Sequence, residues 1–394
     1  MKRLLLYLAS LLLVLLAFFF LLAPVLVDRL ANRLSGEWQI APSEEAINLH
    51  DSLFVADLHC DVLLWNRNIL KRNGRGHIDI PRLLEGHVAL QFFTVVSKVP
   101  FGLNMERNPA TSDMITLLAA AQRWPVASWG SLEQRALYQA RKLHDFAAKS
   151  RGKLRLIKSV ADLEAYLRQR QETPWITAGL LGIEGAQVLE GDLSKLDDLF
   201  SAGFRMMAPT HFFDTEVGGS AHGVNKGGLT PLGREMVTRM QQKGMLVDLA
   251  HASPKVIDDV LALATKPVVV SHTGVKGTCD NVRNISDAHI SGIANTGGVV
   301  GIAFFEKAVC GTDVQAIVRA IKHVVALAGV DYVALGSDFD GAVATPFDAT
   351  GMVEITDALL NEGFSHEAIA KIMGGNVVRV LRACLPKNSG LTTK

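Results

Sequence analysis

Five residues with metal-ligand side chains stand at the ends of short apolar segments. They are His59 and Asp61 in LFVADLHCD, Glu184 in TAGLLGIEG, His251 in MLVDLAHAS and His272 in PVVVSHTG. Imidazole and carboxylate ligands without cysteine thiolates are typical of catalytic zinc, and they also suit manganese or cobalt. A catalytic zinc needs only three protein ligands, so five ligands predict two metal ions. We expect Glu184 to bridge them, with His59 and Asp61 on one ion and His251 and His272 on the other.

Further polar residues could complete a hydrolytic site. Paired metals in hydrolases share a hydroxide, which is the expected nucleophile. Asp338, in YVALGSDFDG, is the expected proton-transfer group between that water and a leaving amine. Asp340 is the rival, but it precedes Gly341 in a turn, where a turn or cap role is the simpler interpretation. His211, in MMAPTHFF, could stabilise an oxyanion or could be a hydrogen-bonded wall residue. Arg283, in CDNVRNISD, could pair with a substrate carboxylate, although an Arg in a loop is usually solvated.

The segments that carry these residues predict a barrel. Eight strands are expected at 53–59, 88–96, 177–183, 205–210, 245–250, 267–271, 298–304 and 332–337. Most are continuous apolar runs, as in parallel strands covered on both faces, and helical patterns separate most of them. Eight βα units predict an α/β fold of the (β/α)8 TIM barrel type, in which the C-terminal ends of the strands build the active site. A doubly wound open sheet is the alternative, but no GxGxxG follows an early strand. Segment 97–176 is expected to add helices at the side of the barrel.

The N-terminus is expected to lie outside the barrel. Residues 4–27 are almost wholly apolar and follow Lys2 and Arg3. About 20 apolar residues span a bilayer, and the run ends without a good cleavage site. An uncleaved transmembrane helix is therefore favoured over a cleaved signal peptide or a buried core helix. We expect this anchor at 1–28, a linker and short helix at 29–52, the catalytic barrel at 53–386 and a polar tail at 387–394. A short basic N-terminus before one span places the catalytic domain on the extracytoplasmic side, although flanking charges discriminate little.

Composition excludes some classes of function. The chain has 394 residues, 49% of them hydrophobic, with a net charge of +1. No long basic run occurs, so nucleic acid is not an expected partner. The four cysteines form no CxxC, which excludes a structural zinc ribbon. In an exported domain Cys279 and Cys310 could pair, because they lie on successive strand–loop units, while four reduced thiols are the other interpretation.

Several motifs together resemble the membrane (renal-type) dipeptidases, which are zinc enzymes with a metallo-dependent hydrolase barrel. The motifs are DLHCDVLLW, GIEGAQVL, APTHFFD, GLTPLGREMVTRMQQKGMLVDLAHAS, PVVVSHTG, NVRNISD, YVALGSDFDG and MGGNVVRVL, in order between about residues 53 and 382. The resemblance implies that the five metal-ligand residues hold two zinc ions and that Glu184 bridges them. It implies substrate contacts for His211 and Arg283 and the catalytic role for Asp338. It also implies a Cys279–Cys310 disulfide, as in animal relatives, and a possible homodimer.

The sequence departs from the family in three ways. Cys60 stands where Asn is common, and FFDTEVGGSAHG after His211 differs from the polar, Asn-containing stretch that lines the substrate pocket in many members. The resemblance therefore does not fix the dipeptide preference. An N-terminal anchor in place of the C-terminal lipid anchor of animal members indicates a bacterial inner-membrane protein with a periplasmic catalytic domain.

We therefore expect a membrane-anchored zinc dipeptidase that hydrolyses L-L and L-D dipeptides. One alternative is another binuclear amidohydrolase, such as an N-acyl-amino-acid deacylase. A binding protein that has lost catalysis is the other, and it is disfavoured because all five ligands and Asp338 are present.

Overall fold

Eight parallel strands form a curled central sheet in this computed structural model, which describes residues 1–35 and 41–388. The strands are β2 (Val55–Cys60), β3 (Val88–Val96), β5 (Thr177–Glu184), β6 (Phe204–Met207), β7 (Leu246–Val247), β8 (Val269–Thr273), β9 (Val299–Ile302) and β10 (Val333–Leu335). Their spatial order is β7-β6-β5-β3-β2-β10-β9-β8. A parallel bridge between Asp248 and Val269 joins the two ends of this order. The predicted α/β barrel is confirmed.

The strands form because both of their faces are apolar and buried. All eight contribute to one buried cluster, which includes Leu58, Leu90, Leu180 and Val299 together with Tyr166 and Leu381 from two helices. Alternate side chains, such as Phe93, belong to a second cluster shared with the outer helices. Continuous apolar segments of this kind are expected for parallel strands covered on both sides.

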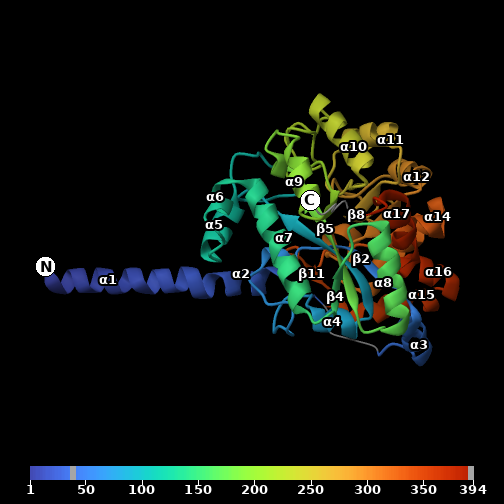
Figure 1. Ribbon diagram of the computed structural model, residues 1–394, viewed down its shortest axis with the longest axis horizontal. Helices are drawn as coiled ribbons and strands as arrows, with labels where there is room; N and C mark the ends of the chain where they lie inside the picture. Colours follow the sequence, from blue (N-terminus) through green and yellow to red (C-terminus); the bar gives the residue numbers. More distant parts are fainter. Residues whose placement is uncertain (36–40, 389–394) are drawn as a thin grey trace.

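Helices surround the sheet (Figure 1). They include α4 (Ile80–Glu85), α7 (Leu132–Lys149), α8 (Val160–Glu172), α9 (Lys195–Ser201), α10 (Pro231–Lys243), α11 (Pro254–Leu263), α12 (Asp287–Asn295), α13 (Glu306–Val309), α14 (Val314–Ala328), α15 (Met352–Asn361), α16 (His366–Ala370) and α17 (Asn376–Cys384). The side chains of Ser131, Thr230 and Asp313 accept backbone hydrogen bonds in the first turns of α7, α10 and α14. These caps satisfy amide groups that have no partner within the helix.

Among the strands that precede candidate site residues, three end earlier than predicted. β6 ends at Met207, β7 at Val247 and β10 at Leu335, whereas the sequence predicts strands to residues 210, 250 and 337. The backbone then turns, and His251 and Asp338 adopt left-handed φ angles of 61° and 63°. A residue with a left-handed φ angle cannot continue a strand. This conformation is strained for any residue other than glycine, and it is found often at functional sites. His211, His251 and Asp338 therefore lie on loops, a few residues beyond the strands rather than directly after them.

The segment between β3 and β5 contains the predicted extra helices and one unpredicted strand. β4 (Leu154–Leu156) pairs in parallel with the first residues of β5 and lies outside the main strand order. α7 and α8 cover the barrel, α5 (Met114–Ala121) lies beside the N-terminal helix, and α6 (Ala127–Gly130) packs against α5 and α7 (Figure 1). Of the expected linker and tail, residues 36–40 and 389–394 lie outside the described part of the chain.

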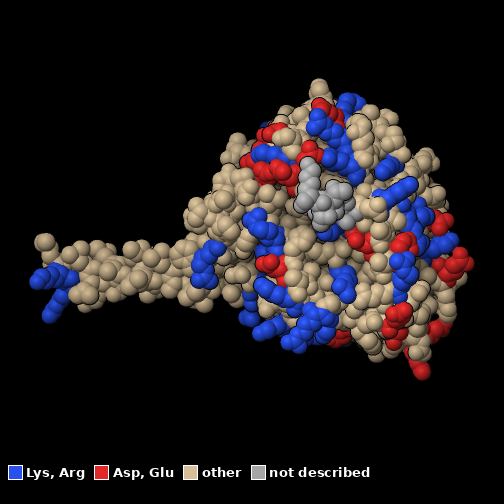
Figure 2. Space-filling model, viewed as in Figure 1, with Lys and Arg blue, Asp and Glu red and all other residues tan. Residues whose placement is uncertain are grey.

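The N-terminal helix projects from the barrel. It comprises α1 (Lys2–Ala17), a π-helical turn (Phe18–Leu22) and α2 (Ala23–Ala31), and the structure then adds α3 (Glu44–Ser52) within the predicted linker. The 30-residue helix has a mean hydropathy of 2.9 over its most apolar window, which makes it long and apolar enough to cross a membrane. Figure 2 shows basic side chains at its free end and an uncharged surface behind them. A membrane anchor and a signal sequence both have these properties.

The base of this helix is clamped to the barrel. The buried Asp28 carboxylate forms an ion pair with Arg67 Nε at 3.2 Å and accepts a hydrogen bond from Arg75 Nε at 2.6 Å. Directly after the helix, β1 (Arg33–Leu34) pairs in parallel with β11 (Ala344–Thr345). Asn32 Oδ1 accepts from the backbone amide of Ala342 at 3.0 Å. The helix is therefore tied to the loop that follows β10.

Arg67 joins this clamp to the barrel, and its loss is expected to destabilise the fold. The guanidinium is buried between Asp28 and Asp340, and its Nη2 lies 2.7 Å from Asp340 Oδ1; both contacts are ion pairs whose angles fall outside hydrogen-bond geometry. We expect Arg67→Met to lower the free energy of unfolding by about 3–5 kcal/mol, because Asp340 would keep a buried, unpaired charge. Denaturant-induced unfolding of the full-length protein in detergent would measure this loss of stability.

The matched control is Arg72→Met. Arg72 pairs with Glu85, and these side chains are 51% and 53% exposed, so the change is expected to cost less than about 1 kcal/mol. Equal losses in the two variants would show that the buried ion pairs of Arg67 add nothing beyond a surface pair.

Candidate metal centre

The candidate residues meet at the C-terminal ends of the strands. His59 lies within β2, with Asp61 just after it, Glu184 is the last residue of β5, and His272 lies within β8. His251 follows β7 on its loop. Since the strands are parallel, all of these ends lie on one side of the barrel. The structure thus brings together five residues that are separated by up to 213 positions in the chain.

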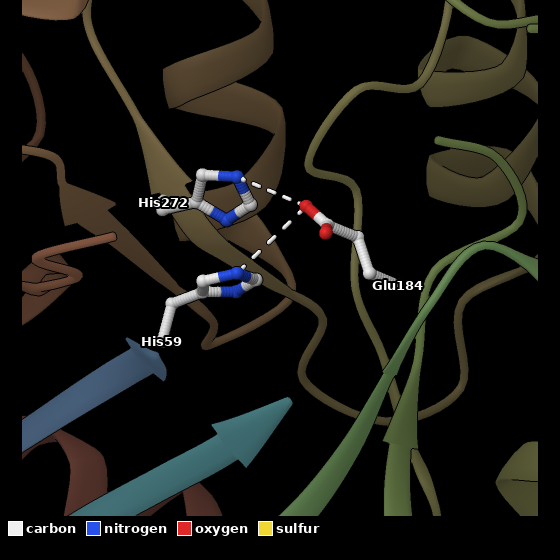
Figure 3. A group of neighbouring side chains, drawn as sticks. All are labelled: His59, Glu184 and His272. Carbon is white, nitrogen blue, oxygen red and sulfur yellow. Dashed lines mark ion pairs between the residues drawn. The ribbon is translucent and has the colours of Figure 1, made fainter. Parts of the chain in front are cut away.

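Glu184 lies at the centre of the cluster. Its Oε1 atom is 3.0 Å from His251 Nε2, 3.4 Å from His272 Nε2 and 3.7 Å from His59 Nε2. Figure 3 shows the rings of His59 and His272 side by side, both facing this oxygen. The second oxygen, Oε2, is 3.2 Å from His211 Nε2. One buried carboxylate is therefore shared among four imidazoles.

Three overlapping groups of side chains have metal-binding geometry. Within each group the possible ligand atoms all lie within 4.8 Å of one another. The groups are His59 with Glu184 and His272, Glu184 with His211 and His251, and His59 with Asp61 and Asp338. The first two share Glu184, and the third places Asp61 Oδ1 3.5 Å from His59 Nε2. His211 is therefore itself part of a group with metal-binding geometry, although the sequence predicts only a substrate contact for it.

The electrostatics of the cluster fit a cation. Burial lowers the pKa of His211, His251 and His272 well below the usual value, so these rings are neutral and offer lone pairs. Burial, followed by the nearby Asp61 charge, raises the pKa of Glu184 well above its usual value. His251 Nε2 and His272 Nε2 are only 3.0 Å apart, and His251 Nδ1 has no hydrogen-bond partner within the described chain. His59 differs: burial lowers its pKa, but the charges of Asp61 and Glu184 outweigh burial and raise the pKa to about 10, so the carboxylates here attract a positive charge. Three neutral imidazoles beside such carboxylates, without thiolates, suit a divalent metal.

A buried hydroxyl orients two of the imidazoles. Ser271 Oγ donates to Asp248 Oδ2 at 2.6 Å and lies 2.9 Å from His272 Nδ1 and 3.3 Å from His59 Nδ1. A hydroxyl that gives its proton to Asp248 can accept only from ring N–H groups, and this leaves the Nε2 atoms free to bind metal. Thr94 Oγ1 lies 2.6 Å from Asp61 Oδ1 on the other side of the cluster.

Sequence reasoning missed these three supporting residues. Thr94, Asp248 and Ser271 lie inside strands or next to them, and they look like ordinary polar residues of a buried strand. The only available signal was that Ser271 directly precedes His272 and that Asp248 shares the MLVDLAHAS segment with His251.

The structure separates Asp338 from Asp340. The Asp338 carboxyl lies 3.8 Å from His59 Nε2, and burial, only partly offset by the His59 charge, raises its pKa to about 7. Asp340 faces away from the cluster, pairs with Arg67 and accepts a hydrogen bond from the backbone amide of His77 at 2.8 Å. Asp340 therefore has a structural environment, and Asp338 lies in the cluster.

Arg283 is held at the edge of the cluster by the loop after β8. Its Nη2 donates to the backbone carbonyl of His272 at 2.6 Å, and burial lowers the pKa of the guanidinium. In the same loop Cys279 forms a disulfide with Cys310, with a Cα–Cα distance of 5.4 Å. The disulfide ties this loop to the end of α13. Cys60 and Cys384 are buried free thiols.

Asp61, Glu184, His211, His251, Arg283 and Asp338 all line one cavity of about 680 Å³. A volume of this size is typical of small-molecule sites. A metal-binding cluster at the C-terminal end of a parallel barrel, open to such a cavity, defines a metal-dependent hydrolase of the barrel type.

Comparison with known proteins identifies the family. The chain matches the model of the membrane dipeptidase family, peptidase family M19, over residues 43–389, and it belongs to that family. It is 27% identical over 383 residues to an uncharacterized dipeptidase of Schizosaccharomyces pombe, a match that covers 91% of this chain and 88% of the relative. It is 30% identical over 320 residues to the dipeptidase tcpJ of Claviceps purpurea, covering 78% and 69%.

Solved structures give the same result. The metallopeptidase dipeptidase AC, of family M19, superposes with a TM-score of 0.69 at 26% identity, covering 84% of this chain and 99% of that one. A metallopeptidase from Rhodobacter sphaeroides, solved with a phosphinate mimic of the dipeptide L-Ala-D-Ala, gives a TM-score of 0.68 at 25% identity with the same coverage. The chain is therefore a hydrolase of the metallodipeptidase class.

Proposed function

We propose that this protein is a membrane-anchored zinc dipeptidase that cleaves L-L and L-D dipeptides. One observation carries the proposal: the carboxylate of Glu184 is shared by imidazoles from different strands, and Arg283 and Asp338 line the same cavity. Cleavage of L-D dipeptides is supported by the Rhodobacter sphaeroides relative, whose bound ligand mimics L-Ala-D-Ala.

Two zinc ions, or manganese or cobalt in their place, would be held by five residues. They are His59, Asp61, Glu184, His251 and His272, with Glu184 between the two ions. When bound, such a pair supplies Lewis acidity and a water whose pKa is near neutral.

The remaining residues would bind the substrate and move its proton. Arg283, a buried cation in the cavity, would bind the C-terminal carboxylate through a bidentate ion pair. His211, neutral because it is buried, would donate a hydrogen bond to the developing oxyanion. Asp338, whose pKa of about 7 lies near the working pH, would take up the proton of the attacking water and pass it to the leaving amine.

We also propose that the N-terminal helix anchors the protein with the barrel on the extracytoplasmic side. The helix is long and apolar enough to span a membrane, and the Cys279–Cys310 disulfide suits an oxidising compartment. The proposed organisation is an anchor at 1–28, a linker at 29–52, a catalytic domain at 53–386 and a short tail. Protease accessibility in intact cells and spheroplasts would test the orientation.

Metal analysis combined with a dipeptide panel tests the proposed activity. Purified full-length protein in detergent is expected to contain two zinc ions per chain and to hydrolyse Gly-D-Ala and L-L dipeptides. Substrates with a blocked amino group form the second arm of the panel. Cleavage of blocked substrates alone would replace the dipeptidase with an N-acyl-amino-acid deacylase, and absence of stoichiometric metal would overturn the proposal.

Ser271 offers a separate test of the metal site. We expect Ser271→Ala to weaken metal affinity by about 10–100-fold, because His59 and His272 would lose the hydroxyl that orients them. Competition with a chelator would measure the affinity. The matched control is Ser291→Ala, since the exposed Ser291 hydroxyl bonds only to the carbonyl of Asp287 in its own helix. Unchanged affinity in Ser271→Ala would show that the rings are oriented by packing alone.

A further inference from the structure

The cavity at the metal centre extends to the N-terminal helix. Besides the residues of the centre, it is lined by Phe19, Ala23, Pro24, Val27 and Ala31, all from the projecting helix. At about 680 Å³ it falls in the range of sites for drug-sized ligands, whereas the smallest dipeptides are far smaller. The cavity is therefore larger than a small dipeptide bound at the metal centre would fill.

The wall between the metal centre and the helix is apolar. Trp65, Val99, Leu103, Met114 and Leu117 contribute to it. Leu103, Met114 and Leu117 remain more than one-third exposed although they are large apolar side chains. A wall of this kind offers few hydrogen bonds to a peptide, but it would gain about 0.8 kcal/mol for each methylene group that it removes from water.

The helix is a fixed part of this wall. Both the π-helical turn and α2 contact α5. Ala31 packs against a buried cluster that includes Leu64, Val96 and Ile115. Asp28 is held by Arg67 and Arg75 just before Ala31. A flexible tether would leave the cavity open on this side, whereas the clamped helix closes it.

We infer that the cavity binds an amphiphilic dipeptide whose long alkyl chain lies along α2 and α5. The peptide head would lie at Glu184 and Arg283, and the tail would follow the apolar wall towards the membrane end of the molecule, from which the helix projects (Figure 1). This inference rests on the proposed dipeptidase function. It makes the anchor helix a specificity determinant as well as an attachment.

A chain-length series on the full-length protein in lipid nanodiscs tests the inference. In the first series the dipeptides end in D-Ala, and the side chain of the first residue lengthens from that of Ala to that of 2-aminodecanoic acid. In the second series the alkyl side chain is on the C-terminal residue. We expect kcat/KM to rise about fourfold for each methylene that enters the cavity in at least one series, which is the ratio that ~0.8 kcal/mol gives.

Two helix variants supply the matched comparison. Val27 and Leu26 are adjacent on α2 and equally exposed, at 47%, but only Val27 lines the cavity. Val27→Trp is expected to remove the chain-length preference by filling the cavity, while Gly-D-Ala turnover stays unchanged. Leu26→Trp is expected to behave like the wild type in both respects, which controls for partition of the substrates into lipid.

Binding of a reduced-amide analogue of the long-chain dipeptide, measured by calorimetry, gives a readout independent of turnover. Turnover of Gly-D-Ala without any chain-length effect would overturn the inference and leave the dipeptidase intact. Tight analogue binding that Val27→Trp weakens, without hydrolysis of any dipeptide, would keep the alkyl site and overturn the proposed function. Equal binding in the two Trp variants, or binding matched by a simple alkanol, would overturn the inference.

Discussion

Asp338→Asn is expected to lower kcat for Gly-D-Ala by about 10²–10⁴-fold while the metal content stays the same. General acid–base groups contribute on this scale, and the amide of Asn can neither take up nor deliver the proton. The carboxyl lies at the edge of the histidine cluster, 3.8 Å from His59, so its loss leaves the five proposed ligands in place. Steady-state kinetics and elemental analysis of the same preparation would measure both quantities.

Asp340→Asn is the comparison, two residues along the same loop. Its carboxylate pairs with the buried Arg67 and accepts backbone hydrogen bonds, so we expect a lower melting temperature and little change in kcat for the folded protein. The opposite pattern, with kcat lost in Asp340→Asn and kept in Asp338→Asn, would assign proton transfer to Asp340.

Glu184→Gln is expected to reduce both metal content and turnover. The carboxylate contacts four imidazoles, and an amide supplies a neutral oxygen on one side only. Changes to residues that merely orient metal ligands cost roughly 10–100-fold, so the loss of a shared ligand is expected to cost kcat/KM at least about 100-fold. We expect fewer than two zinc ions per chain, with excess zinc restoring activity only in part.

Glu190→Gln controls for a change of charge near the same strand. Glu190 follows β5 by six residues, and its carboxylate pairs with Lys195 at the partly exposed end of the next helix. Its replacement is expected to change neither metal content nor turnover. Full metal occupancy in Glu184→Gln would show that this carboxylate does not bridge the ions.

Features that depend on the residues of one strand could be predicted from the sequence. Continuous apolar segments bounded by polar residues predicted all eight barrel strands, and β3 has the predicted bounds. The polar residues at the strand ends converge because parallel strands present these ends on one side, which needs no knowledge of long-range packing. The distinction between Asp338 and Asp340 also rested on local position, and the two carboxylates lie in different environments, while the role of Asp338 stays a prediction.

Features that depend on distant contacts could not be predicted. The Thr94 hydroxyl becomes a supporting group only when β3 lies beside the end of β2, and the Ser271 hydroxyl only when β8 lies between the ends of β7 and β2. The pairing of β1 with β11 joins residues 311 positions apart in the chain and involves two residues on each strand, too few to give a periodic pattern. The N-terminal helix reads as a simple hydrophobic anchor, because nothing in an apolar sequence reveals which of its faces closes a cavity.

The clamp at Asp28 has a consequence for the way the enzyme samples its surroundings. A catalytic domain on a flexible linker of n residues explores a distance of about 5–6 Å × √n from its attachment point. Here the helix passes directly into the ion pairs of Asp28 and, within the first residues of the proposed linker, into a short sheet on the barrel. With the helix in a bilayer, the mouth of the site would stay at a fixed height in the headgroup layer. Substrate capture would then follow surface concentration and lateral diffusion rather than bulk concentration.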